Sequence, residues 1–254
     1  MKIQYASDLH IEFPENKGFL KANPIKPIGV ILILAGDIVP FAVLDKHKDF
    51  FNYVSDHFET TYWIPGNHEY YYSDVANKSG TLNEKIRSNV FLVNNTTVVN
   101  ENKTFILSTL WSKIRPAYQW QIERGMSDFH VIKYDGHRFS AEKFNQLHNE
   151  SLKFVEQELN KEKSGKTIVA THHVPTLLNY PEKYKGDVLN DAFAVELFDL
   201  IETKGPDYWI YGHTHNNTND FKIGKTQLLT NQLGYVMHNE QYSFINDKRI
   251  EIDV

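Results

Sequence analysis

Five short segments of the chain carry side chains that can bind a metal ion or transfer a proton. They are Asp8-Leu9-His10, Gly36-Asp37, Gly66-Asn67-His68-Glu69, His172-His173 and Gly212-His213-Thr214-His215. Imidazole and carboxylate ligands suit Mn, Fe, Zn or Co, whereas calcium would require an all-oxygen cage. The chain contains no Cys, so any bound metal must rest on His, Asp, Glu or Asn.

Each segment taken alone has an ordinary structural explanation. Asp37 after Gly36 suits a turn, Asn67 suits a loop, and a single His is most often a satisfied core or surface residue. The set is harder to explain in this way, because buried carboxylates and imidazoles gathered at one place are unstable without a compensating cation. The five segments together therefore favour a metal site.

The elements that precede these segments explain how they could meet. Each segment directly follows a short apolar run that is typical of a buried strand, at residues 3–6, 30–35, 61–64, 167–171 and 208–211. A further run of this kind spans residues 104–107. In open α/β sheets the carboxyl ends of the strands face a shared crevice, so we expect the five segments to converge there.

Helical patterns alternate with these strands, at residues 44–58, 81–87, 140–163 and 195–203. In the clearest of them, Ser140 can cap the start and Gly165 lies past the end. The alternation predicts an α/β layered fold with a central sheet and helices outside. After Gly212 the pattern changes to short strand candidates at residues 221–223, 225–229, 242–245 and 249–254, which predict an antiparallel C-terminal end.

The composition limits the class of protein. The chain has 254 residues, long enough for a large core, and we expect a single domain over residues 1–254. Its net charge of -5 provides no basic field, so we expect no long nucleic acid as partner. No apolar run approaches the roughly 18 residues of a membrane span, and the first residues lack the apolar region of a secretory signal. We expect a cytoplasmic protein that binds no membrane; the oligomeric state stays open.

The stretch at residues 111–139 has no clear period and is rich in aromatic and charged residues. We interpret it as a cap or insert over the site, and a surface excursion packed on its own aromatic residues is an equally good explanation. Aromatic rings near the motifs could stack a nucleobase, although such rings belong more often to the core. The rings in question are Tyr70, Tyr71, Tyr72, Trp111, Tyr118, Trp120 and Phe129.

The five segments, in this order, resemble the calcineurin-like metallophosphoesterase superfamily, whose motifs are DxH, GD, GNH, H and GHxH. The motifs run from Asp8 to His215 and so cover most of the chain. Residues 108–112, 171–175 and 231–235 are similar to the bacterial predicted phosphohydrolase members. The resemblance implies a two-sheet β-sandwich flanked by helices, and the periodicity alone does not indicate the second sheet.

The resemblance also implies a ligand set for two divalent metal ions, most simply Mn, Fe or Zn. One ion would take Asp8, His10 and His215, the other would take Asn67, His172 and His213, and Asp37 would bridge them. His172 is preferred to His173 because it directly follows the strand. His68 would lie outside the ligand set, where it could protonate the leaving oxygen or stabilise the transition state, with Glu69 or Asp37 as its orienting group.

The implied activity is hydrolysis of a small phosphomonoester or phosphodiester by a hydroxide that bridges the two ions. The substrate would be a small phosphorylated molecule, with nucleotides among the candidates. The chain lacks the GDxxDRG arginine of the protein Ser/Thr phosphatases, and Pro40 replaces the Tyr ligand of the purple acid phosphatases. The alternative is a non-catalytic metal-binding scaffold or protein-interaction module, but such members usually lose ligands that this chain retains.

Overall fold

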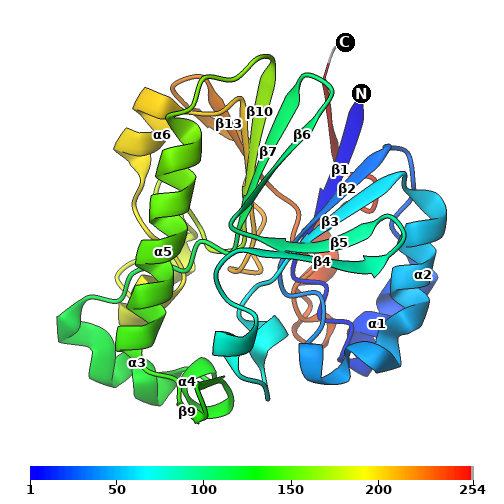
Figure 1. Cartoon of the computed structure of the whole chain (residues 1–254). Helices are drawn as coiled ribbons and strands as arrows, with labels where there is room; N and C mark the ends of the chain where they lie inside the picture. The colour runs from blue at the N-terminus through cyan, green and yellow to red at the C-terminus, as the bar shows by residue number, and fades with distance from the viewer. Residues whose placement is uncertain (253–254) are drawn as a thin grey trace.

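Two six-stranded sheets face each other in a computed structural model that describes residues 1–252 (Figure 1). The first sheet has the order β14 (Arg249–Glu251), β1 (Lys2–Ala6), β2 (Ile31–Ala35), β3 (Thr60–Ile64), β5 (Val90–Asn94), β4 (Leu82–Arg87). The second has the order β12 (Phe221–Ile223), β13 (Thr226–Thr230), β11 (Tyr208–Tyr211), β10 (Lys166–Thr171), β7 (Lys103–Ser108), β6 (Thr96–Asn100). The two-sheet sandwich is thereby confirmed.

The continuous apolar run of β2 follows from burial on both of its faces. Ile31 and Ile33 pack between the two sheets, while Leu32 and Leu34 point to the outer face of the first sheet. Successive side chains of a strand alternate between faces, so a strand covered on both sides must be apolar throughout. The strands β1, β2 and β3 pair in parallel, which brings their carboxyl ends to one edge.

Helices cover the outer face of each sheet (Figure 1). Helices α1 (Pro14–Ala22) and α2 (Lys48–His57) lie on the first sheet, and α5 (Ala141–Leu159) and α6 (Phe198–Lys204) lie on the second. Ser140 caps α5 as expected, because its hydroxyl accepts a hydrogen bond from the Lys143 N–H. The resulting order is helices, sheet, sheet, helices. Among residues 1–252, no helix is both long and apolar enough to cross a membrane.

Two expected elements are wrong. Residues 81–87 form the strand β4 instead of a helix, because they pair antiparallel with β5 through an irregularity between Lys85 and Arg87. Residues 242–245 form no strand, because the Asn231 side chain bonds both the N–H and the carbonyl of Ile245. The C-terminal end is also not purely antiparallel. β12 pairs antiparallel with β13, and β14 pairs antiparallel with β1, but β13 runs parallel to β11. Residues 253–254 of the last expected strand lie outside the described residues.

The 111–139 segment forms two short helices and a small hairpin at the end of the molecule opposite the chain termini (Figure 1). Its elements are α3 (Gln119–Gly125), α4 (Asp128–Val131), β8 (Lys133–Tyr134) and β9 (His137–Arg138). Trp111, Ile122 and Phe129 are buried in one apolar cluster with Phe144 of α5. The segment is thus packed in an apolar cluster that also includes residues of α5.

Candidate metal centre

The five polar segments converge at the carboxyl ends of β1, β2, β3, β10 and β11. Backbone hydrogen bonds join neighbouring loops: the Asp8 N–H donates to the Gly36 carbonyl at 2.9 Å, and the Gly212 N–H donates to the His172 carbonyl at 3.0 Å. A bond between the two sheets completes the arrangement, since the His213 N–H donates to Asp8 Oδ1 at 3.0 Å. Residues as far apart in the sequence as Asp8 and His215 therefore meet in one site.

Four side chains form the first ligand cluster: Asp8, His10, Asp37 and His215 each offer one atom, and these atoms all lie within 4.8 Å of one another. His10 Nε2 is 3.0 Å from His215 Nε2, and His215 Nε2 is 3.5 Å from Asp8 Oδ1. Asp37 Oδ2 is 3.8 Å from His10 Nε2. This cluster unites the three residues expected on one ion with the expected bridge.

The second cluster is formed by Asp37, His172 and His213. His172 Nε2 is 3.0 Å from His213 Nδ1 and 3.3 Å from Asp37 Oδ2. Asn67 joins this cluster, with its Oδ1 3.2 Å from His172 Nε2. Asp37 is thus common to both clusters, and all seven expected ligands are brought together.

His173 lies beside the ligands but belongs to neither cluster. Its Nδ1 accepts a hydrogen bond from the Ser112 N–H at 3.2 Å, and its ring lies 4.3 Å from that of His213. Burial, followed by the neighbouring imidazoles His213 and His172, lowers its pKa well below the usual value. The neutral ring therefore packs against a ligand, while its Nε2 has no hydrogen-bond partner among residues 1–252.

The backbone is held in left-handed conformations at five of the seven expected ligands. The φ angles are positive at Asp8 (55°), His10 (44°), Asp37 (55°), His213 (79°) and His215 (51°). Residues with a Cβ rarely adopt such angles, and each instance costs of the order of 1–3 kcal/mol. The surrounding fold sustains this strain at the positions that aim ligand atoms inward.

Glycines in three of the motifs make room for the ligands. A Cβ at Gly36 would lie 2.2 Å from His172 Nδ1, one at Gly66 would lie 2.2 Å from Asp37 Oδ1, and one at Gly212 would lie 2.6 Å from Asp8 Oδ2. Gly36 also has a φ of +90°, which favours glycine. The glycines of GD, GNH and GHxH are therefore required by close approach of the ligand side chains.

Outer partners orient the imidazoles. His172 Nδ1 is 2.9 Å from the Ala35 carbonyl, His10 Nδ1 is 3.2 Å from Glu12 Oε1, and His215 Nδ1 is 2.8 Å from Glu240 Oε2. An acceptor on one ring nitrogen holds the proton there, so the other nitrogen keeps a free lone pair. Glu12 and Glu240 were missed by the sequence analysis. Glu12 lies two residues after His10, and this closeness in the sequence is the feature that could have indicated its role.

The donor set fits divalent cations. The ring nitrogens of His10 and His215, and those of His172 and His213, face each other in pairs at 3.0 Å with carboxylate oxygens alongside. Each of these rings also has an acceptor at its other nitrogen. When a neutral ring places its one proton there, both facing nitrogens present lone pairs, which a cation can accept while it balances the carboxylates. Burial opposes ionisation of Asp37, but His172 and His68 hold its pKa well below the usual value. In the metal-free site, protonated imidazoles therefore balance the Asp37 carboxylate, and a bound cation would replace their positive charge.

His68 lies outside these two clusters, at their edge, and forms a third group of close metal-competent side chains with His10 and Glu12. Its ring stacks on Tyr71 with centroids 4.0 Å apart, its Nδ1 is 3.7 Å from Glu12 Oε1, and its Nε2 is 3.3 Å from the Tyr235 hydroxyl. Burial favours the neutral ring, but Asp37 and Glu12 raise its pKa. Burial likewise opposes ionisation of Glu12, but the hydrogen bond with His10 and the nearby His68 imidazole lower its pKa to about 2. The two side chains thus form an oppositely charged pair.

Glu69, one of the two groups considered for orienting His68, has a different role. Its buried carboxylate accepts hydrogen bonds from the backbone N–H groups of Asp37, Ile38 and Gly66 and from the Trp63 indole. Asp37, the other group considered, accepts from the backbone N–H of His68. Glu69 therefore ties the loops after β2 and β3 together.

The comparisons with known proteins agree with this site. Residues 1–217 match the model of the calcineurin-like phosphoesterase family. The chain belongs to this family of metal-dependent phosphoesterases. It is 30% identical to an uncharacterized protein of Acanthamoeba polyphaga mimivirus, over 99% of this chain and 98% of that protein. The expected superfamily is thereby confirmed.

A solved structure shares the fold. The phosphopantetheinyl hydrolase of Mycobacterium tuberculosis is similar with a TM-score of 0.70 at 15% identity, over 99% of this chain and 96% of that one. A dimetal phosphatase of Danio rerio is similar with a TM-score of 0.47 at 12% identity, over 91% of this chain and 87% of that one.

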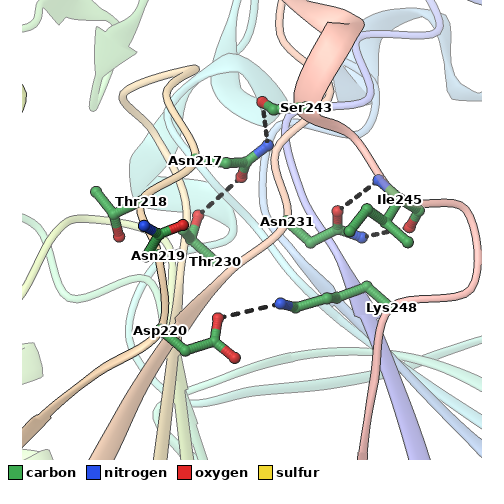
Figure 2. A pocket seen from close by; sticks show the side chains of 9 residues that line it. All are labelled: Asn217, Thr218, Asn219, Asp220, Thr230, Asn231, Ser243, Ile245 and Lys248. Atoms are coloured by element: carbon green, nitrogen blue, oxygen red, sulfur yellow. Dashed lines mark hydrogen bonds and ion pairs between the residues drawn. The ribbon is translucent and has the colours of Figure 1, made fainter.

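A polar pocket of about 400 Å³ lies beyond the GHxH motif, outside the ligand clusters (Figure 2). Its side chains mainly bond one another: Asn217 bonds Ser243 and Thr230, and Lys248 pairs with Asp220 at 3.1 Å. These bonds tie the C-terminal segment to the loop after β11. The side chains that line the pocket therefore stabilise the loop that carries His215.

Most of the aromatic rings considered for base stacking are not available. Tyr70, Trp111 and Phe129 are buried in the apolar cluster of the 111–139 segment, and Tyr71 is stacked on His68. Tyr72 and Trp120 remain well exposed, at 74% and 67%. Tyr72 and Trp120 are thus the exposed rings of this set on which a nucleobase could stack.

Proposed function

We propose that the chain hydrolyses a small phosphomonoester or phosphodiester with two divalent ions, Mn, Fe or Zn. The observation that carries this proposal is the position of Asp37, whose carboxylate belongs to both ligand clusters. A shared carboxylate is what two adjacent ions require, and the remaining six ligands divide into two sets around it. When bound, such ions would supply Lewis acidity and an activated water molecule at neutral pH.

The side chains divide the remaining work. Asp8 and Asp37 bring negative charge that offsets the cations, and Asn67 is a neutral ligand that adds none. His68, stacked on Tyr71 and paired with Glu12, is held with its Nε2 facing the Tyr235 hydroxyl. We infer that the protonated His68 donates a proton to the leaving oxygen, a role in which a positioned acid contributes about 10²- to 10⁴-fold.

The charge distribution favours a small substrate. Two divalent ions with Asp8, Asp37 and a hydroxide leave a local charge of about +1, and the Glu12–His68 pair leaves that balance unchanged. The chain as a whole carries a charge of -5, which disfavours long polyanions. The proposed substrate is therefore one small phosphorylated molecule.

The test is turnover by metal-stripped protein to which Mn, Zn, Fe or Mg is added back. Chromogenic phosphomonoesters and phosphodiesters serve as substrates, and Asp37→Asn is the control, because it weakens the shared ligand while keeping its size. We expect metal-restored turnover that the control abolishes. If two ions bind but no substrate is turned over with any metal, the scaffold or binding-module alternative replaces this proposal.

A further inference from the structure

Asp128 is a buried carboxylate of α4, within the 111–139 segment, that touches the site from outside the five motifs. It is 1% exposed. The Asn67 side-chain amide donates from Nδ2 to both of its oxygens, at 3.0 and 3.2 Å. The Tyr71 hydroxyl donates to Asp128 Oδ1 at 2.8 Å. One carboxylate thus contacts an expected ligand and the residue on which His68 is stacked.

The bond from Asn67 decides which end of its amide faces the ligand cluster. Both oxygens of Asp128 accept hydrogen bonds from the amide, and only the Nδ2 end of an amide can donate to them. The Oδ1 end must then point the opposite way, where it lies 3.2 Å from His172 Nε2. A rotated amide would present N–H donors to a cation and could not bind it.

The bond from Tyr71 acts on the other half of the site. With its hydroxyl fixed on Asp128, the Tyr71 ring is held in the plane that stacks on His68, with centroids 4.0 Å apart. The carboxylate is itself fixed, because α4 packs into the apolar cluster through Phe129. Asp128 therefore links the 111–139 segment to both Asn67 and His68.

We propose that Asp128 is a positioning residue that selects the metal-binding orientation of Asn67 and holds Tyr71 beneath His68. The 111–139 segment would thereby have a specific role at the site. This role of Asp128 rests on the proposed two-ion function. Hydrogen-bond partners of metal ligands typically change metal affinity or activity by 10- to 100-fold when they are replaced.

The test is a calorimetric titration of metal-stripped Asp128→Asn with Mn²⁺. The new amide can donate to Asn67 Oδ1, so the Asn67 amide can turn its N–H groups toward the cluster at almost unchanged volume. We expect one of the two ions to bind 10- to 100-fold more weakly, the other to be unaffected, and the melting temperature to stay near that of the wild type. Asp135→Asn, the same exchange at an exposed turn of the segment, should bind both ions normally.

Tyr71→Phe separates the two contacts, because it keeps the ring on His68 and the carboxylate on Asn67. We expect it to bind both ions with wild-type affinity. Unchanged affinities in Asp128→Asn would overturn the inference, and so would equal weakening of both ions or loss of the fold, which would mark Asp128 as a general structural support. Wild-type protein that binds fewer than two ions would instead contradict the proposed function.

Discussion

The proposed role of His68 can be tested separately from metal binding, because this side chain lies beside the two ligand clusters without belonging to them. In His68→Ala both clusters keep every ligand atom, so the protein should still bind two Mn²⁺ ions. Turnover should fall about 10²- to 10⁴-fold, the usual contribution of a positioned acid. Metal content by mass spectrometry and kcat on a chromogenic ester are measured together. A variant that loses metal would show that His68 supports the ligands instead of acting as the acid.

The same residues show how far single side chains can be predicted from sequence. The five segments could be singled out because each follows a strand and carries residue types that bind metal, whereas the set of seven ligands was expected from the family resemblance. Four further residues at the site lie outside those segments and contact it only in the folded chain. They are Glu12, Asp128, Tyr235 and Glu240. Asp128 in particular lies in a stretch without period, where no pattern could indicate that its carboxylate is buried.

Strand ends and their glycines are the elements on which the site depends. Gly66→Ala would place a Cβ 2.2 Å from Asp37 Oδ1 and 2.7 Å from His172 Nε2, so both ligands must shift. Crowding of this kind typically destabilises by about 1–3 kcal/mol, and we expect Mn²⁺ affinity to fall at least about tenfold because the bridge and a ligand of the second cluster are displaced together. Urea unfolding and Mn²⁺ titration measure the two effects.

The matched control is Gly18→Ala in α1, where a Cβ meets nothing within 4 Å. This exchange should raise the free energy of unfolding by about 0.5–1 kcal/mol, since glycine is less favourable than alanine inside a helix. Its metal binding should equal that of the wild type. Wild-type affinity in Gly66→Ala would show that the ligands tolerate displacement and that close approach is not what requires this glycine.

At the same scale, local pattern predicted the strands that carry ligands better than the rest of the fold. Buried parallel strands are short and mostly apolar, so they stand out: β2 is apolar throughout, and β10 has an apolar centre. The strand β4 was taken for a helix because its face alternation is weak and only pairing with β5 fixes its form. The division into two sheets depends on long-range pairing, which periodicity does not contain, and was expected from the family resemblance alone.

The whole molecule is arranged so that two sheets bring their strand ends to one place. The first sheet contributes Asp8, Asp37 and Asn67, and the second contributes His172 and His213. The apolar layer between the sheets fixes their separation, and the 111–139 segment fixes the Asn67 amide. Two ions that share Asp37 would therefore lie where both halves of the sandwich meet.

The most direct test of that claim is anomalous diffraction from crystals of the protein grown with Mn²⁺. We expect two peaks, one on each side of the Asp37 carboxylate. The first should lie among Asp8, His10 and His215, and the second among Asn67, His172 and His213. A single peak, or ions bound away from Asp37, would contradict it.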